Sequence, residues 1–394
     1  MFADRINRIQ PSTTLAMTSK AAELRAKGKN VINLSVGEPD FPTPVNIQEA
    51  AFKAIKDGYT KYTPGAGMME LRKAASYKMQ RDNNLNYKEN EIIVSCGGKH
   101  SLYNACQVLF QKDDEVIIFT PYWVSFPDFV SVTGATPVFV NTNSSKQFEP
   151  DFKDLEEKIT SKTKGIIINS PSNPTGGVWS DDAVKNVLNI AKDKNLWVFS
   201  DECYEQLTYD VKYNSTASLT DDTSKILTFQ SCSKTYSMTG WRIGYTAGDP
   251  EVIKAMSKLQ GQSTSCPNSI AQVAAIEALS GDQTEIAVMR DAFKFRRNLI
   301  VEQLNSISGV SCEMPGGAFY VFPSFENFIG KSIHNKKIDS ATQITMYLLE
   351  NKYVVSVAGD AFGSPNNIRF SYAASEKDIN NAVNALNDVL EKVK

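Results

Sequence analysis

The sequence predicts an α/β protein whose large domain holds a mostly parallel, seven-stranded sheet between helices, beside a smaller α+β domain. Two observations carry this prediction. From about residue 90 to 250, short apolar runs alternate with amphipathic segments, the pattern of a parallel sheet covered by helices on both faces. Both flanks of the chain break this alternation, which indicates a second domain of different build.

Each apolar run in the central region is of strand length. We predict strands at residues 91–98, 114–121, 136–141, 164–171, 196–202, 225–231 and 242–248. Amphipathic segments at 99–110 and 181–194 predict helices between them. The second of these begins with two acidic residues, which favour a helix N-terminus.

The flanks supply fewer elements. Residues 20–27 read as a helix, and a long amphipathic stretch at 285–307 leads to the strand-like runs "GGAFYVFPSF" and "NNIRFSYAAS" and to a final helix. We therefore predict a large domain at 45–290 and a small domain formed by residues 1–44 and 291–394 together.

Composition excludes several classes of function. The formal net charge of -2 argues against nucleic acid as a partner, because neutralising phosphates requires excess positive charge. The longest apolar runs are too short to span a bilayer, and the first residues resemble no signal peptide. We expect a cytoplasmic protein without a membrane partner. The six cysteines form no CxxC motif and the two histidines are too few for most metal sites, so we expect reduced thiols and no metal.

Polar residues follow the predicted strands, at the edge where open α/β sheets bind ligands. Gly98 and Lys99 stand where a strand turns into a helix, and free amides there can bind phosphate. Trp123 offers a flat wall for an aromatic ligand, and Asn173 lies in the turn-rich "SPSNPTGG". Alone, each feature is more often structural. The glycines match neither GxGxxG nor the P-loop, which disfavours dinucleotides and nucleoside triphosphates.

The next two strand ends carry ionisable groups. Asp201 follows a fully apolar run, so its carboxylate needs a cationic partner, and Tyr204 lies three residues on. Lys234 stands between small polar residues in "SCSKTYSMTGWRIGY", with Ser231 and Arg242 as suitable phosphate ligands. A lysine, a buried acid, an anion site and an aromatic wall together fit pyridoxal 5'-phosphate (PLP).

These motifs resemble the class I PLP-dependent aminotransferases of fold type I, and most of all the bacterial-type aspartate aminotransferases of the aspartate/prephenate subgroup. The resemblance extends from "PSTTLAMTSKA" through "GEPDFPTP", "KYTPGAGMMELR", "NSPSNPTGG" and "SDECYE" to "IRFSYA". The lysine motif ending in "GWRIGY" is its most specific part.

The resemblance implies a role for each site residue. Lys234 would form the Schiff base with PLP and carry the proton between substrate and cofactor, and Asp201 would keep the pyridine nitrogen protonated. The cofactor's O3′ would be held by Tyr204 and Asn173, its ring by Trp123, and its phosphate by Ser231, Arg242, Gly98, Lys99 and, across a homodimer interface, Tyr62. The substrate would be bound by Gly37, Trp123, Asn173, Arg369, Lys99, Ser12 and Thr14.

Arg369 also has a case independent of the resemblance. An arginine between apolar residues of a strand requires an anion, and a substrate carboxylate fits its planar fork. A structural salt bridge is the alternative.

The resemblance favours L-aspartate as amino donor and 2-oxoglutarate as acceptor, in a ping-pong mechanism, because Lys99 stands where the subgroup binds a distal carboxylate. Members that use prephenate often have a basic residue before "PS", where this chain has Gln10. Prephenate, aromatic or neutral amino acids therefore remain alternative substrates. The same fold would also suit a carbon–sulfur lyase or a non-catalytic regulator.

Overall fold

The computed structural model describes residues 2–11 and 13–394, and in the helix Thr13–Ala26 side chains are described from residue 16 onward. Its largest feature is an eight-stranded sheet in the order β2-β9-β8-β7-β6-β3-β4-β5. The strands are β2 (Ile92–Ser95), β3 (Glu115–Thr120), β4 (Thr136–Asn143), β5 (Glu149–Pro150), β6 (Thr163–Asn169), β7 (Trp197–Asp201), β8 (Ile226–Ser231) and β9 (Gly244–Ala247).

The predicted α/β class and mostly parallel sheet are confirmed, and two details differ. The eighth strand is the two-residue β5, which pairs antiparallel with β4 and is too short to give a periodic signal. Strand β9 runs antiparallel to both β2 and β8. Only the adjacent strands β8, β7, β6, β3 and β4 are parallel to one another.

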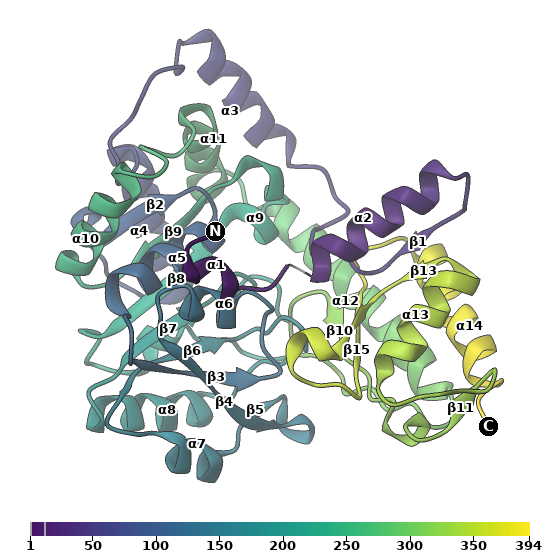
Figure 1. Cartoon of the computed structure of the whole chain (residues 1–394). Coiled ribbons are helices and arrows are strands. Elements are labelled where there is room, and N and C mark those ends of the chain that lie inside the picture. The colour runs from purple at the N-terminus through teal and green to yellow at the C-terminus, as the bar shows by residue number, and fades with distance from the viewer. Residues whose placement is uncertain (1, 12) are drawn as a thin grey trace.

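Helices cover both faces of this sheet (Figure 1). On one face the core includes residues of α4 (Met69–Asn83), α8 (Asp181–Asp193) and α11 (Ser269–Ser280), with α3 (Val45–Lys56) packed on α11. On the other face it includes residues of α5 (Gly98–Leu109), α6 (Phe126–Ser131) and α10 (Pro250–Gly261). Burial on both faces explains why strands such as β6 and β8 are apolar or uncharged at nearly every position.

The second part of the molecule lies beside the first (Figure 1). It contains α12 (Thr284–Ser306), α13 (Ala341–Lys352), α14 (Glu376–Leu390) and the three-stranded antiparallel sheet β10 (Tyr320–Val321), β15 (Ile368–Ser371) and β14 (Val357–Ala358). The molecule also contains several short elements, namely α1 (Asp4–Asn7), α7 (Phe152–Lys158), α9 (Cys232–Thr235), β11 (Ser332–Ile333) and β12 (Lys336–Lys337).

The two ends of the chain meet in this second part. Strand β1 (Ile32–Asn33) pairs in parallel with β13 (Val354–Val355). Helix α2 (Thr13–Ala26) packs there too, because buried Ala21 shares a small core with Leu349 and Val355. Figure 1 shows the purple α2 beside the yellow-green C-terminal elements.

Helix α12 joins the two parts. Ile286, near its start, belongs to the core of the large sheet, whereas Phe293 belongs to the core of the second part. The predicted boundary between residues 290 and 291 therefore falls inside one continuous helix, and the division of the chain at 44/45 and 290/291 stays a prediction. Within the described residues, no helix has both the length and the apolar composition needed to cross a membrane.

Candidate active site

A cavity of about 270 Å³ opens beyond the carboxyl ends of β6, β7 and β8, next to the N-terminus of α5. This is the edge at which parallel sheets bind ligands. Eleven predicted site residues line it: Gly37, Gly98, Lys99, Trp123, Asn173, Asp201, Tyr204, Ser231, Lys234, Arg242 and Arg369. Residues more than 300 positions apart in the sequence thus meet around one space.

Lys234 enters the cavity from α9, a single helical turn directly after β8. Ser231 caps this turn, because its hydroxyl oxygen accepts the backbone N–H of Ser233. The Lys234 ammonium donates to the carbonyl oxygen of Gly37. Burial lowers the pKa of Lys234 below its usual value, because an apolar environment disfavours the charged amine. A lysine of this kind can act as a nucleophile and as a base.

Asp201 ends β7 with its side chain at the cavity and only 7% exposed. Its Oδ1 accepts the backbone N–H of Cys203 at 3.2 Å. In the part of the chain that the structure describes, no lysine or arginine forms an ion pair with it. Burial raises the pKa of Asp201 to about 7. Such a carboxylate is suited to a cationic ligand atom.

Tyr204 and Asn173 line the same cavity as this acid. The Tyr204 hydroxyl forms a 2.9 Å hydrogen bond with the hydroxyl of Tyr320. The Asn173 side-chain oxygen accepts a hydrogen bond from Arg369, and its backbone N–H donates to Asn169. Both side chains are thereby held in position by neighbours within the site.

Arg369 lies in β15 and is 1% exposed. One terminal nitrogen donates to Asn173 Oδ1 at 2.8 Å and the other to the Ser35 carbonyl at 2.6 Å. Its guanidinium lies between the rings of Tyr320 and Phe362, 4.6 and 5.1 Å from their centroids. Its Nε is buried without a hydrogen-bond partner. The predicted alternative, a structural salt bridge, is absent among the described residues, so this cation is available to an anionic ligand.

Arg242 lies beside the N-terminus of α5, where the sequence predicts a phosphate site. Arg242 has a left-handed backbone (φ 58°) and donates from its guanidinium to the Thr239 carbonyl. A side chain at Gly97, whose φ is +94°, would lie 2.5 Å from the Arg242 guanidinium. The missing Cβ therefore lets the arginine approach the first amides of the helix, where phosphate binds well.

Trp123 and Lys99 form a further part of the wall. The Lys99 ammonium lies 4.9 Å from the centroid of the Trp123 ring, and the ring meets Phe126 and Phe129 edge to face. Burial, and secondarily the charge of Arg242, lowers the pKa of Lys99. The pair offers a flat apolar surface next to a cation.

Three predicted residues are not placed in this cavity. Tyr62 is 89% exposed and does not line it. Residue 12 lies outside the described residues, and the side chain of residue 14 is likewise outside the description. Their predicted roles stay predictions.

Sequence reasoning missed several residues that line the cavity, chiefly Tyr320, Asn169 and Cys203. Asn169 donates to the Asp201 carbonyl and accepts from Asn173, so it joins two strand ends. Its place directly after "GIII" was the available signal. Tyr320 had none, because its contacts come from three distant segments.

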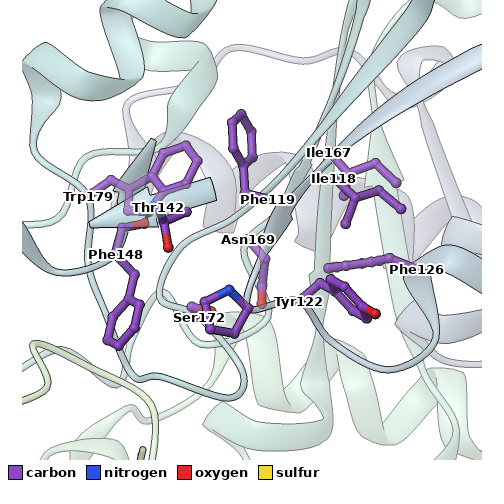
Figure 2. Close-up of a pocket in the computed structure, with 11 residues that line it drawn as sticks. Ile118, Phe119, Tyr122, Phe126, Thr142, Phe148, Ile167, Asn169, Ser172 and Trp179 are labelled. Atoms are coloured by element: carbon purple, nitrogen blue, oxygen red, sulfur yellow. Dashed lines mark hydrogen bonds between the residues drawn. The ribbon is translucent and has the colours of Figure 1, made fainter. Parts of the chain in front are cut away.

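A second cavity adjoins the first and shares Asn169 with it. Figure 2 shows it between the aromatic side chains of Phe148 and Trp179 and those of Tyr122 and Phe126. Its volume is about 20 Å³, which is room for one water molecule. Of these two cavities, only the larger can hold a cofactor.

The larger cavity fits PLP by its unpaired groups. Asp201 has no ion-pair partner in the described chain, Arg242 lies next to Gly97 at the start of α5, and Arg369 has no carboxylate partner among the described residues. These match a ring nitrogen, a phosphate and a substrate carboxylate in turn. Lys234 lies among them with its amine inside the cavity.

The fold and this cavity define an aminotransferase, and the chain belongs to the class I and II aminotransferase family, whose characteristic sequence matches residues 29–386. The resemblance drawn from the motifs is thereby confirmed. Among its relatives is a probable aspartate/prephenate aminotransferase of Rhizobium leguminosarum bv. phaseoli, 46% identical over 97% of this chain and 96% of the relative. The aspartate aminotransferase of Bacillus subtilis (strain 168) is 44% identical over 99% of both chains.

Solved structures agree. An aspartate aminotransferase from Rhizobium meliloti superposes with a TM-score of 0.96 at 39% identity, covering 100% of both chains. The aspartate aminotransferase of Thermus thermophilus with maleate gives a TM-score of 0.93 at 37% identity, covering 99% of both. The predicted fold class is confirmed by these neighbours.

Proposed function

We propose that this aminotransferase uses PLP to move the amino group of L-aspartate to 2-oxoglutarate, giving oxaloacetate and L-glutamate by a ping-pong mechanism. The observation that carries the proposal is the meeting of Lys234, Asp201 and Arg369 around one cavity, the latter two without an ion-pair partner in the described structure. Relatives named aspartate aminotransferase support the substrate.

When bound, PLP supplies an aldehyde carbon for the amine and a ring that withdraws electrons from it. The chain's own residues do the rest. Arg369 binds the α-carboxylate of the substrate through its fork, and Asn173 fixes the orientation of that guanidinium. Asp201, a buried carboxylate without an ion-pair partner in the described chain, would hold a protonated ring nitrogen. Trp123 lines the cavity and offers the flat face of its ring to the cofactor.

Lys234 moves the proton. Its lowered pKa favours the neutral amine, which can accept the proton from the substrate Cα and deliver it to the cofactor C4′. Gly37 positions this amine through its carbonyl oxygen. Lys99 provides a cation for the distal carboxylate of aspartate. After oxaloacetate leaves, 2-oxoglutarate binds through the same contacts in the second half of the cycle and accepts the amino group.

A homodimer with shared sites is part of the proposal. Residues 45–62 expose a run of large apolar side chains, namely Val45, Phe52, Ile55, Tyr59 and Tyr62, which are between 41% and 89% exposed. Apolar patches of this kind mark interfaces. Tyr62 of one subunit would reach the phosphate that is bound in the other subunit. The six free cysteines fit a reducing, cytoplasmic location.

Prephenate is the second candidate as amino acceptor. Relatives at 46% and 41% identity are named probable aspartate/prephenate aminotransferases. The residue before "PS" in this chain is Gln10, whose backbone N–H donates to Asp128 of α6, two residues after Phe126. No cation stands at this position.

The deciding experiment is a substrate panel. Purified protein with PLP is given each amino acid with 2-oxoglutarate, and separately glutamate or aspartate with prephenate. Conversion between the aldehyde and amine forms of the cofactor is followed by absorbance. We expect the highest kcat/KM with aspartate and no turnover by Lys234→Ala. A protein that takes up no PLP, or that transaminates only neutral amino acids, would contradict the proposal.

A further inference from the structure

Behind β7 and β8, on the face of the sheet opposite the cavity, lies a cluster of buried polar side chains. It consists of Lys78, Asn83, Glu202, Glu205 and Gln230, each 7% exposed or less. Lys78 and Asn83 come from α4, Gln230 from β8, and the two glutamates from the segment that follows β7. Buried charges are expensive unless they are paired.

The positive charge of the cluster is already paired. Lys78 forms an ion pair with Glu205 and donates to the side-chain oxygens of Asn83 and Gln230, each at 2.9 Å. Asn83 in turn donates to the other oxygen of Glu205 at 3.2 Å. Lys78 and Glu205 therefore form a neutral, closely bound unit.

Glu202 is left without a cation. It is 0% exposed and forms no ion pair with any lysine or arginine of the described chain. Its oxygens accept from Ser200 Oγ (2.9 Å), Ser215 Oγ (2.8 Å), the Thr216 N–H (3.0 Å) and Gln230 Nε2 (3.2 Å). Burial raises the pKa of Glu202, whereas the hydrogen bonds from Ser215, Ser200, Thr216 and Gln230 act in the opposite direction because they stabilise its ionised form. The cluster then holds two carboxylates and one ammonium, a net charge of about -1.

This charge lies directly behind Asp201. The two residues are consecutive, and successive side chains along extended backbone point to opposite faces. Asp201 faces the cavity and Glu202 the cluster. The negative charge of Glu202 also adds to the burial that raises the pKa of Asp201.

We propose that Glu202 is a positioning residue for the reaction, whose buried negative charge acts through Asp201 to hold the ring nitrogen of the cofactor in its cationic form. The proposal rests on the proposed function for its cofactor. Charge at this depth is poorly screened by solvent. A carboxylate behind Asp201 therefore favours a positive charge in front of it.

The groups that face Glu202 define what a titration would report. They are Asp201 and Glu205 near it in the chain, Lys78 from α4, and the phenols of Tyr87, Tyr213 and Tyr245. Burial raises the pKa of each of these three tyrosines, so they stay neutral between pH 4 and pH 9. Burial also raises the pKa of Glu202 itself, and the charge of Lys234 opposes the rise in the pKa of Asp201. The titration of Asp201 is therefore obtained by comparing variants that differ only at position 201.

The first test needs no cofactor. The free energy of unfolding of the full-length apoprotein is measured from pH 4 to pH 9 for wild type, Asp201→Asn, Glu202→Gln and the double variant. The free energy of Asp201→Asn is subtracted from that of wild type, and the free energy of the double variant from that of Glu202→Gln. Each difference, followed against pH, isolates the titration of Asp201. We expect its midpoint, near pH 7 in the wild type, to fall by about one pH unit when Glu202 becomes Gln.

Two variants separate charge from packing. Ser215→Ala removes a hydrogen bond to Glu202 but no charge, and Glu202→Asp keeps the charge, so both should leave the Asp201 midpoint near that of wild type. If Glu202→Gln does not fold, Glu205→Gln removes the other carboxylate and should lower the midpoint as well. A midpoint that is the same in wild type and the charge-removing variant, or that moves equally in Ser215→Ala, overturns the proposal.

The second test uses PLP as the probe. Its dissociation constant is expected to rise about tenfold in Glu202→Gln, equivalent to one pKa unit at the ring nitrogen, and to change little in Ser215→Ala. ¹⁵N NMR of PLP labelled at the ring nitrogen should show less protonation in Glu202→Gln. A wild-type protein that binds no PLP refutes the proposed function, whereas wild-type binding with an unchanged ring nitrogen in the variant refutes the role of Glu202 alone.

Discussion

Asp201 and Arg369 each bring a buried ionisable group to the cavity, and neither forms an ion pair with a described residue. In the folded chain alone, such groups lower stability. They are explained if a ligand supplies the missing charges. Both therefore lead to predictions that can be tested on one residue at a time.

Asp201 should make the stability of the apoprotein depend on pH. Its pKa in the folded chain, about 7, lies above the ordinary value of 3.8. The folded state therefore binds the proton more tightly, and the free energy of unfolding falls as pH rises from about 4 to 7. Asp201→Asn should remove this slope and be more stable than wild type at pH 8 by a few kcal/mol. Urea unfolding of both proteins at pH 5 and pH 8 measures this. If the free energy of unfolding changes equally between the two pH values in wild type and Asp201→Asn, Asp201 is not an unpaired carboxylate with a raised pKa.

Arg369 should govern substrate affinity and leave PLP binding intact. Replacing it by Gln removes a charged, bidentate contact, so kcat/KM for aspartate should fall at least about 100-fold. Arg369→Lys keeps the charge but loses the fork and should restore little. Steady-state kinetics alongside PLP titration check this. Loss of PLP binding in both variants would point to a structural role.

At the scale of elements, the connection between β2 and α5 would determine the geometry of the proposed phosphate site. Gly97 has a positive φ of +94°, and a Cβ atom at this position would lie only 2.5 Å from the Arg242 guanidinium. Gly98, the next residue, has ordinary contacts no shorter than 3.5 Å and a helical position. Adjacent glycines thus have different requirements.

We expect Gly97→Ala to destabilise the protein by roughly 1–3 kcal/mol through backbone strain and to weaken PLP binding, because Arg242 must move. Gly98→Ala, the matched control, should stay near wild type in both, since alanine keeps the N–H and suits a helix. Thermal unfolding and PLP titration of the pair decide this. Equal effects in the two variants would contradict the assignment of the anion site.

At the scale of the whole molecule, the cavity draws on both parts of the chain. Lys234, Asp201 and Trp123 come from the large sheet and its loops, whereas Tyr320 and Arg369 come from the second part. In the proposed homodimer, the partner chain would contribute Tyr62 to the cavity as well. This side chain is exposed in the single chain and therefore free to contact a second subunit.

Subunit mixing tests this sharing. In a dimer of Lys234→Ala and Tyr62→Ala chains, one site would carry both substitutions and the other neither, if Tyr62 acts across the interface. Mixing the two weak parents should then restore about a quarter of wild-type activity, as half of the dimers are hybrids with one intact site. If Tyr62 acts in its own subunit, or the protein is monomeric by ultracentrifugation, mixing restores nothing.

The sequence alone determined the periodic elements and the polar residues at strand ends. Strands such as β6 and β8 are apolar because both faces are covered, and this pattern is local. Lys234, Asp201 and Asn173 could be predicted because a residue that follows a parallel strand must lie at the ligand edge of the sheet.

Only the tertiary structure decided which side chains meet across distant segments. The hydroxyl contact between Tyr320 and Tyr204, the hydrogen bond from Arg369 to Asn173, and the ion pair of Lys78 with Glu205 each join residues more than 100 positions apart. The antiparallel direction of β9 was equally invisible. The physical reason is that periodicity records only whether a residue is buried, whereas these features depend on which partner shares the interior with it.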